Sequence, residues 1–271
     1  MNETLHGSRL LFLGSGAADW PPFEDGAPFP QPFVYRSNAS LLVDGHILID
    51  CGPKTMTRLS ALGCQAEQIT DLMITHSHSD HYDADQVYAL SDLPRPKPLR
   101  IWYPAGVELR LSSFKHVELY ALHPGDVAIP RGYSVLALAA NHPVRTTSEI
   151  PLAYLFDNEI CRWLYATDGA WFNAHSWRRF CDEPAINALI IDCTLGEVVG
   201  DWRVFEHNSL AMVKQIVAVM RHNGLFAPAA QVVLTHLAKE THLPHLELAR
   251  QVAAEGLTVA FDGMELDISG D

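Results

Sequence analysis

The chain has 271 residues, of which 48% are hydrophobic and 19% are charged. No uninterrupted apolar run reaches the roughly 18 to 20 residues that a membrane-spanning helix needs, and the polar N-terminal segment shows no export signal. We therefore expect a cytoplasmic protein without a membrane partner, folded as a single domain over residues 1–271. The formal net charge of −13 argues against a nucleic-acid partner, because affinity for a phosphate backbone depends on Lys and Arg.

Short apolar runs between turn residues indicate buried strands in the first third of the chain, at 10–13, 41–43, 47–49 and 72–74. Asp44-Gly45 is typical of a two-residue hairpin turn, and Pro53 begins a predicted helix that ends near Gly63. Prolines and aromatic residues alternate in segment 19–36. A loop of this length in a compact domain is usually functional or disordered, so we weigh a flap over the substrate against a surface loop packed on the core.

The rest of the chain repeats the strands and then becomes helical. Further strands are predicted at 133–138, 152–156, 162–166 and 186–191. Apolar residues at helical spacing predict a helix over 209–223, with Asn208 or Ser209 as its N-cap and Gly224 at its end. A strand at 231–235, a helix at 243–255 and a strand at 257–261 follow. This mixture predicts an α/β fold, a sandwich of two sheets with helices outside.

Four potential metal ligands lie within six residues, directly after the predicted strand 72–74: His76, His78, Asp80 and His81. Imidazole and carboxylate groups without sulfur suit zinc or manganese, and also iron. The five cysteines lack CxxC spacing, which favours reduced thiols over a disulfide framework or a cysteine-based zinc site. The spacing of the four ligands suits two divalent ions better than one. The alternative is a histidine-rich loop in solvent.

Three more potential ligands each follow a predicted strand: His142, Asp168 and His236. Strand ends on one rim of a sheet are where a rigid fold can gather distant ligands. The pattern HxHxDH followed by separate His, Asp and His resembles the metallo-β-lactamase superfamily over nearly the whole chain. The resemblance implies a four-layer αββα sandwich. It also implies that His76, His78 and His142 hold one metal ion, that Asp80, His81 and His236 hold the other, and that Asp168 bridges the two.

Within that superfamily the chain most resembles the phosphoribosyl 1,2-cyclic phosphate phosphodiesterases of the carbon–phosphorus lyase pathway. The likeness lies in segments 141–142, 206–208 and 261–265, the last of which is expected to form a turn between two final strands. Those relatives carry an additional structural zinc site. Here segment 19–36 has no cysteine, and Lys239 stands where the resemblance implies a histidine, so we expect that site to be missing. The altered segment is expected to lie near the pocket, which leaves the identity of the substrate open.

The predicted function is the hydrolysis of a small cyclic phosphodiester, either phosphoribosyl 1,2-cyclic phosphate or a related cyclic nucleotide, by a metal-dependent phosphodiesterase. Two bound ions supply hydroxide near neutral pH, which Asp80 and Asp168 orient. His207 is the candidate general acid for the leaving alkoxide, unless it only caps the following helix.

Several alternatives stay open at the same metal site. They are ribonuclease Z-like activity, thioesterase activity, lactonase activity, and a binding protein of the superfamily without catalysis. The expected partner is a small anionic molecule, and the aromatic residues of segment 19–36 also allow a homodimer interface.

Overall fold

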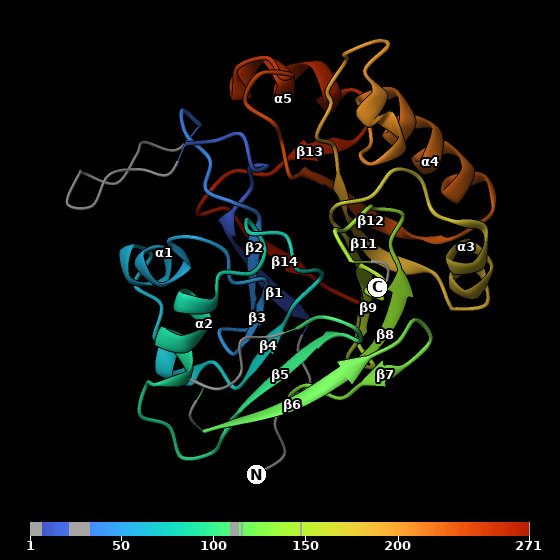
Figure 1. Cartoon of the computed structure of the whole chain (residues 1–271). Helices are drawn as coiled ribbons and strands as arrows, with labels where there is room; N and C mark the ends of the chain where they lie inside the picture. Colours follow the sequence, from blue (N-terminus) through green and yellow to red (C-terminus); the bar gives the residue numbers. More distant parts are fainter. Residues whose placement is uncertain (1–6, 22–32, 109–113, 115, 147, 271) are drawn as a thin grey trace.

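The computed structural model describes residues 7–21, 33–108, 114, 116–146 and 148–270, and its strands form two sheets of seven within those ranges (Figure 1). The first sheet has the order β14-β1-β2-β3-β4-β5-β6, built from β14 (Glu265–Ile268), β1 (Ser8–Gly14), β2 (Ser40–Val43), β3 (Ile47–Ile49), β4 (Asp71–Met73), β5 (Leu99–Pro104) and β6 (Val117–Leu122). The second has the order β13-β12-β11-β10-β9-β8-β7, built from β13 (Leu257–Val259), β12 (Phe226–Thr235), β11 (Ile186–Asp192), β10 (Arg162–Ala166), β9 (Leu152–Asp157), β8 (Ser134–Ala139) and β7 (Val127–Ala128).

Helices cover the outer face of each sheet. On the first sheet, Leu59 of α1 (Thr55–Ala61) and Val87 of α2 (Ala84–Ser91) pack with strand residues such as Leu72. On the second sheet, the apolar faces of α3 (Ala174–Cys181), α4 (Leu210–His222) and α5 (His245–Ala253) do the same. Two short 3-10 turns, η1 (Ala66–Gln68) and η3 (Trp202–Phe205), complete the described helical elements. The predicted four-layer αββα sandwich is confirmed. Among the described helices, none is long and apolar enough to cross a membrane.

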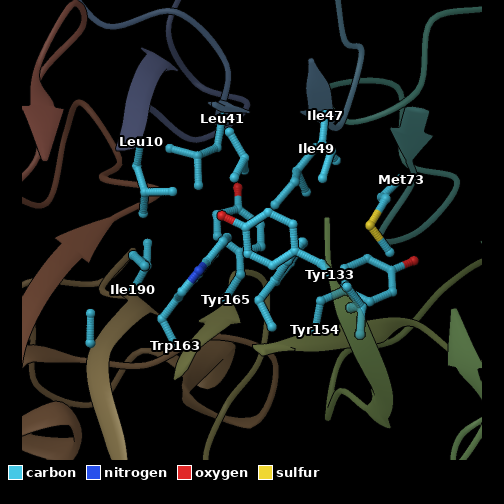
Figure 2. Close-up of a cluster of buried hydrophobic side chains, with 14 of the residues drawn as sticks. Leu10, Leu41, Ile47, Ile49, Met73, Tyr133, Tyr154, Trp163, Tyr165 and Ile190 are labelled. Atoms are coloured by element: carbon cyan, nitrogen blue, oxygen red, sulfur yellow. The ribbon is translucent and has the colours of Figure 1, made fainter. Parts of the chain in front are cut away.

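The main core lies between the two sheets (Figure 2). β10 shows how the sequence builds it: Trp163 and Tyr165 point into the space between the sheets, while Leu164 packs under the helices on the other face. Side chains alternate along a strand, so a strand buried on both faces reads as a continuous apolar run. Phe156 of β9 stacks on Trp163 with ring centroids 4.1 Å apart. The two sheets are therefore held by one shared apolar interior.

The helix predicted over 209–223 is confirmed as α4, together with its Ser209 cap. The Ser209 hydroxyl accepts a hydrogen bond from the Met212 N–H at 3.3 Å, and Gly224 adopts a φ of 68° after the last turn. β10 coincides with the predicted 162–166 strand. β12 begins at Phe226, earlier than the expected residue 231. Pro228 in this stretch is typical of a turn, but the strand includes it, and the pairing with β11 has an irregular register there.

The 261–265 segment forms the expected turn between β13 and β14, and it also carries a buried carboxylate. Asp262 accepts hydrogen bonds from the Ser15 N–H at 3.0 Å and the Ser37 N–H at 2.6 Å, and Arg58 lies 3.6 Å away. The Ser15 carbonyl in turn accepts the Leu237 N–H at 2.9 Å. Asp262 thus joins the loop after β1 to residue 37, and Ser15 in that loop is bonded in turn to the segment directly after β12.

Candidate metal centre

The seven candidate ligands follow the carboxyl ends of strands from both sheets. The segment 76–81 comes after β4, His142 after β8, Asp168 after β10 and His236 after β12. β10, β11 and β12 run parallel to one another, so their carboxyl ends lie on one edge of the second sheet. The structure brings all seven side chains to this rim in two groups.

The first group contains His76, His78, His142 and Asp168, with ligand atoms within 4.8 Å of one another. His78 Nδ1 lies 3.0 Å from His76 Nε2 and 3.1 Å from His142 Nε2. Asp168 Oδ2 lies 3.4 Å from His76 Nε2. Three ring nitrogens and one carboxylate oxygen thus point at one place, as ligands of a cation do.

The second group contains Asp80, His81, Asp168 and His236, again within 4.8 Å. The Asp80 carboxylate lies 3.4 Å from His81 Nε2 and 3.5 Å from His236 Nε2. Asp168 belongs to both groups: its Oδ2 is 3.3 Å from His81 Nε2 and its Oδ1 is 2.9 Å from His236 Nε2. The described residues therefore hold two His/Asp groups that share one carboxylate.

Burial sets the charge of the first group. Because it is fully buried, the pKa of His76 is lowered to about 3, and burial also lowers the pKa of His142. Neutral imidazole is the form that binds a metal ion. The full burial of His76 and His81 does not fit a histidine-rich loop in solvent.

Carboxylates set the charge of the second group. Burial disfavours the charged form of His236, but Asp168 and Asp80 outweigh it and raise its pKa to about 10. The same two carboxylates, with Asp50, hold the pKa of His81 well above its usual range. The carboxylates therefore favour positive charge at this place. A divalent ion bound to neutral His81 and His236 would supply that charge in place of the two ring protons.

Two of the candidate ligands have a backbone conformation that is uncommon for residues other than glycine. Asp168 and His236 both have a φ of 55°, in the left-handed region. A strained backbone conformation of this kind persists only where the surrounding structure enforces it, and such positions are concentrated at functional sites. At both positions it turns the chain sharply after a buried strand and directs the side chain to the rim.

Asp50 is a supporting residue that the sequence analysis missed. Its carboxylate lies 2.8 Å from His81 Nδ1 and accepts the Thr75 N–H at 2.8 Å. A carboxylate on one ring nitrogen fixes the tautomer and leaves the other nitrogen to face a metal ion. Asp50 comes directly after β3, so its position after an apolar run was a usable signal.

Asp192, at the end of β11, supports His207 in the same way. Asp192 Oδ2 lies 2.8 Å from His207 Nδ1, and the His207 ring centroid is 4.8 Å from that of His142. Burial disfavours the charged ring, but Asp192 raises the pKa of His207. Asp168, Asp192, His207 and His236 form a third group that can hold a metal ion by distance alone. The predicted acid thus lies beside the ligands and has a partner that sequence reasoning missed.

Glu149 fixes the ligand loop from the opposite sheet. Glu149 is 5% exposed, and its carboxylate accepts hydrogen bonds from the Ser77 N–H at 2.7 Å and the Ser77 hydroxyl at 2.5 Å. Ser77 stands between His76 and His78. Nothing in the sequence connects residues 77 and 149, because only the folding of β9 beside this loop brings them together.

A cavity of about 430 Å³ opens onto the candidate ligands. Besides those ligands it is lined by His207, Thr194, Arg145 and Arg203 and by small side chains from segment 17–18. Asp19 also lines it and accepts the Lys239 N–H at 2.8 Å. Most of the segment considered as a flap, residues 22–32, lies outside the described residues. Phe33, which follows these residues, stacks on His245 of α5 and is not among the residues that line the cavity.

Comparison with known proteins agrees with this geometry. A family model described as Anti-Pycsar protein Apyc1 matches residues 9–91. A ribonuclease Z of Myxococcus xanthus is 27% identical over 150 residues, which are 50% of this chain and 45% of that protein. A ribonuclease Z of Methanopyrus kandleri matches in the same way, with 31% identity over 144 residues. The match spans about half the length of these curated relatives.

Solved structures match along almost the whole chain. The metallo-β-lactamase fold protein YhfI of Bacillus subtilis has a TM-score of 0.73 at 18% identity, over 96% of this chain and 99% of that one. A diphosphatase of the PhnP family has a TM-score of 0.70 at 23% identity, over 97% and 100%. The protein therefore has the metallo-β-lactamase fold, and the resemblance to that superfamily is confirmed at the level of the fold. Zn²⁺-bound PqqB of Methylobacterium extorquens shares this fold, with a TM-score of 0.64 at 17% identity over 96% of this chain and 100% of that one.

Proposed function

We propose that the protein is a metal-dependent phosphodiesterase with two divalent ions, zinc or manganese, and that it hydrolyses a small cyclic phosphodiester. His76, His78 and His142 would hold one ion, Asp80, His81 and His236 the other, and Asp168 would lie between them. The observation that carries this proposal is the convergence of seven side chains from both sheets into two groups that share Asp168.

A pair of divalent ions supplies hydroxide near neutral pH and stabilises negative charge on a phosphoryl group. The side chains of the protein would orient the metal ligands and donate a proton to the leaving group. Asp50 holds the His81 ring by Nδ1. Asp192 holds His207 by Nδ1 and favours its charged form, which leaves Nε2 as the proton donor to the leaving alkoxide. Glu149 holds the loop that carries His76 and His78.

The size of the cavity supports a small substrate. Pockets for small molecules usually span roughly 300 to 1,000 Å³, and this one lies near the lower end at about 430 Å³. A solved relative is a diphosphatase of the PhnP family, which favours phosphate chemistry. Phosphoribosyl 1,2-cyclic phosphate and cyclic mononucleotides are both small enough to be considered.

Ribonuclease Z-like cleavage is the second candidate, because the most similar curated relatives carry that name. A nucleic-acid substrate must reach the rim from outside the cavity and needs cations to hold its backbone. The chain has 19 Lys and Arg residues against 32 Asp and Glu residues, which favours the small substrate. Cleavage of a precursor transfer RNA at a rate above that of cyclic phosphodiesters would reverse the order of the two candidates.

The deciding experiment is steady-state turnover by the zinc- or manganese-loaded protein of bis(p-nitrophenyl) phosphate, a thioester and a lactone, with His207→Ala alongside. We expect turnover of bis(p-nitrophenyl) phosphate and of 2′,3′-cyclic AMP, measured alongside it. Only the cyclic substrate, whose leaving alkoxide has to be protonated, should slow by about 100-fold or more in the variant, the usual contribution of a general acid. Turnover of the thioester or lactone alone, insensitive to His207, would reject the phosphodiesterase and leave the metal centre in place. No metal uptake would reject both.

A further inference from the structure

The segment between β8 and β9 carries a cation at the cavity. Arg145 lines the cavity and is exposed. Within the described part of the chain its guanidinium makes no hydrogen bond or ion pair. The other lining arginine is already engaged: Arg203 Nε donates to the Asp201 carboxylate at 3.0 Å and its Nη2 lies 2.6 Å from it. Arg145 is thus the lining guanidinium that is available to a ligand.

The structure holds this segment at both ends. At its start, His142 Nδ1 lies 3.0 Å from the Glu206 carbonyl oxygen, and His142 Nε2 faces the first ligand group. At its end, the buried Glu149 carboxylate binds Ser77. One anchor is a candidate metal ligand and the other holds the loop that carries two of them. Arg145 lies between these anchors in the sequence and lines the same cavity as the candidate ligands.

We propose that Arg145 binds a phosphate oxyanion of the substrate and makes the cavity selective for phosphorylated molecules, an inference that rests on the proposed phosphodiesterase function. The planar guanidinium presents paired N–H donors that match two phosphate oxygens, which no other described lining side chain offers in uncommitted form. In a chain of net charge −13, a cation at the rim also offsets the repulsion that an approaching anion meets.

Phosphate oxygens can come from two sources. Arg145 can bind the phosphodiester that is cleaved, or a second phosphate on the same molecule. A matched pair of substrates separates them: 2′,3′-cyclic AMP, with one phosphate, and its 5′-phosphorylated derivative, with two. An effect of the arginine on both substrates identifies the cleaved group, and an effect on the second substrate alone identifies the additional phosphate.

The test compares Arg145→Ala and Arg145→Lys with the wild-type protein, all metal-loaded. Arg178→Ala is the matched control, because Arg178 is exposed on α3 outside the cavity and its loss changes the net charge equally. The first readout is the affinity for inorganic phosphate by calorimetry, which needs no turnover. We expect Arg145→Ala to weaken it roughly tenfold to a hundredfold, the range of a charged hydrogen bond, with a smaller loss in Arg145→Lys.

Equal phosphate affinity in Arg145→Ala, Arg178→Ala and wild type would overturn the inference. The second readout is kcat/KM on the two cyclic substrates and on a neutral lactone, where we expect Arg145→Ala to affect phosphorylated substrates only. A loss of the same size on the lactone would also reject the role. If neither cyclic substrate is turned over, the proposed function fails, while the phosphate affinities still decide whether Arg145 binds phosphate.

Discussion

At the scale of single residues, the Asp192 carboxylate controls the protonation of the His207 ring. A general acid must be protonated before it can donate, so activity is lost as the pH rises through its pKa. Asp192 raises the pKa of His207 and should extend activity to higher pH. Thr194 also hydrogen-bonds this group, with its hydroxyl 3.2 Å from His207 Nδ1 and 3.0 Å from Asp192 Oδ1.

We predict that Asp192→Asn shifts the alkaline limb of the pH profile of kcat/KM to lower pH. The amide keeps an oxygen for the Asn208 N–H, 3.1 Å from Asp192 Oδ1, but it loses the charge that stabilises the protonated ring. The measurement is a pH profile for wild type and variant at equal metal content. Coincident alkaline limbs would show that Asp192 does not control the acid. His207→Ala, which has no ring to titrate, should lack that limb altogether.

At the scale of elements, the candidate centre depends on how two loops from different sheets hold each other. Residues 74–77 after β4 contact β9 and the residues before it in three places. The Leu152 N–H donates to the Thr75 carbonyl at 2.9 Å, the Tyr154 hydroxyl donates to the Ile74 carbonyl at 2.5 Å, and the Ser77 N–H donates to Glu149. Such contacts order the ligands before a metal ion binds, which lowers the entropic cost of binding.

We predict that Glu149→Ala weakens binding of one metal equivalent by about 10- to 100-fold, the effect typical of residues that orient ligands. Glu149→Gln keeps one acceptor for the Ser77 N–H and should lose less. Glu247→Ala, an exposed position on α5, removes the same charge without touching the centre. The measurement is a metal titration monitored by calorimetry and by the Co²⁺ absorption spectrum. Two equivalents bound with wild-type affinity in Glu149→Ala would contradict the role.

At the scale of the whole molecule, the two sheets share the apolar interior in which Leu10 and Ile49 of the first sheet meet Trp163 and Ile190 of the second (Figure 2). Neither sheet can expose that face without a large loss of buried apolar area. The candidate ligands also come from both sheets. We therefore propose that residues 1–271 fold as one unit.

We predict a single unfolding transition in guanidinium chloride, with coincident midpoints by far-ultraviolet circular dichroism and tryptophan fluorescence. A chelator should lower the midpoint, because a metal ion that binds only the folded state stabilises it by mass action. The matched condition is the same protein reloaded with zinc after dialysis. Two separated transitions in the metal-loaded protein would show that the sheets unfold independently and would reject the single unit.

Features that depend only on neighbouring residues could be predicted from the sequence. The spacing of His76, His78, Asp80 and His81 is local, as are the apolar run of β10 and the Ser209 cap of α4. Alternation and helical periodicity are properties of a few consecutive residues, so they survive without tertiary context. The short helix α3 was not predicted, because its eight residues give too little periodicity. The exposed strand β6 lacks an apolar run.

Which distant side chains meet depends on the tertiary structure. The resemblance implied that Asp168 bridges two ligand groups, and the fold brings its carboxylate between them. Asp50, Asp192 and Glu149 acquired their positions from the order and register of strands, which no local pattern specifies. The same holds for Arg145, whose place at the cavity follows from the anchoring of its segment at His142 and Glu149. Convergence depends on long-range strand pairing, and a single sequence records the residues without the pairing.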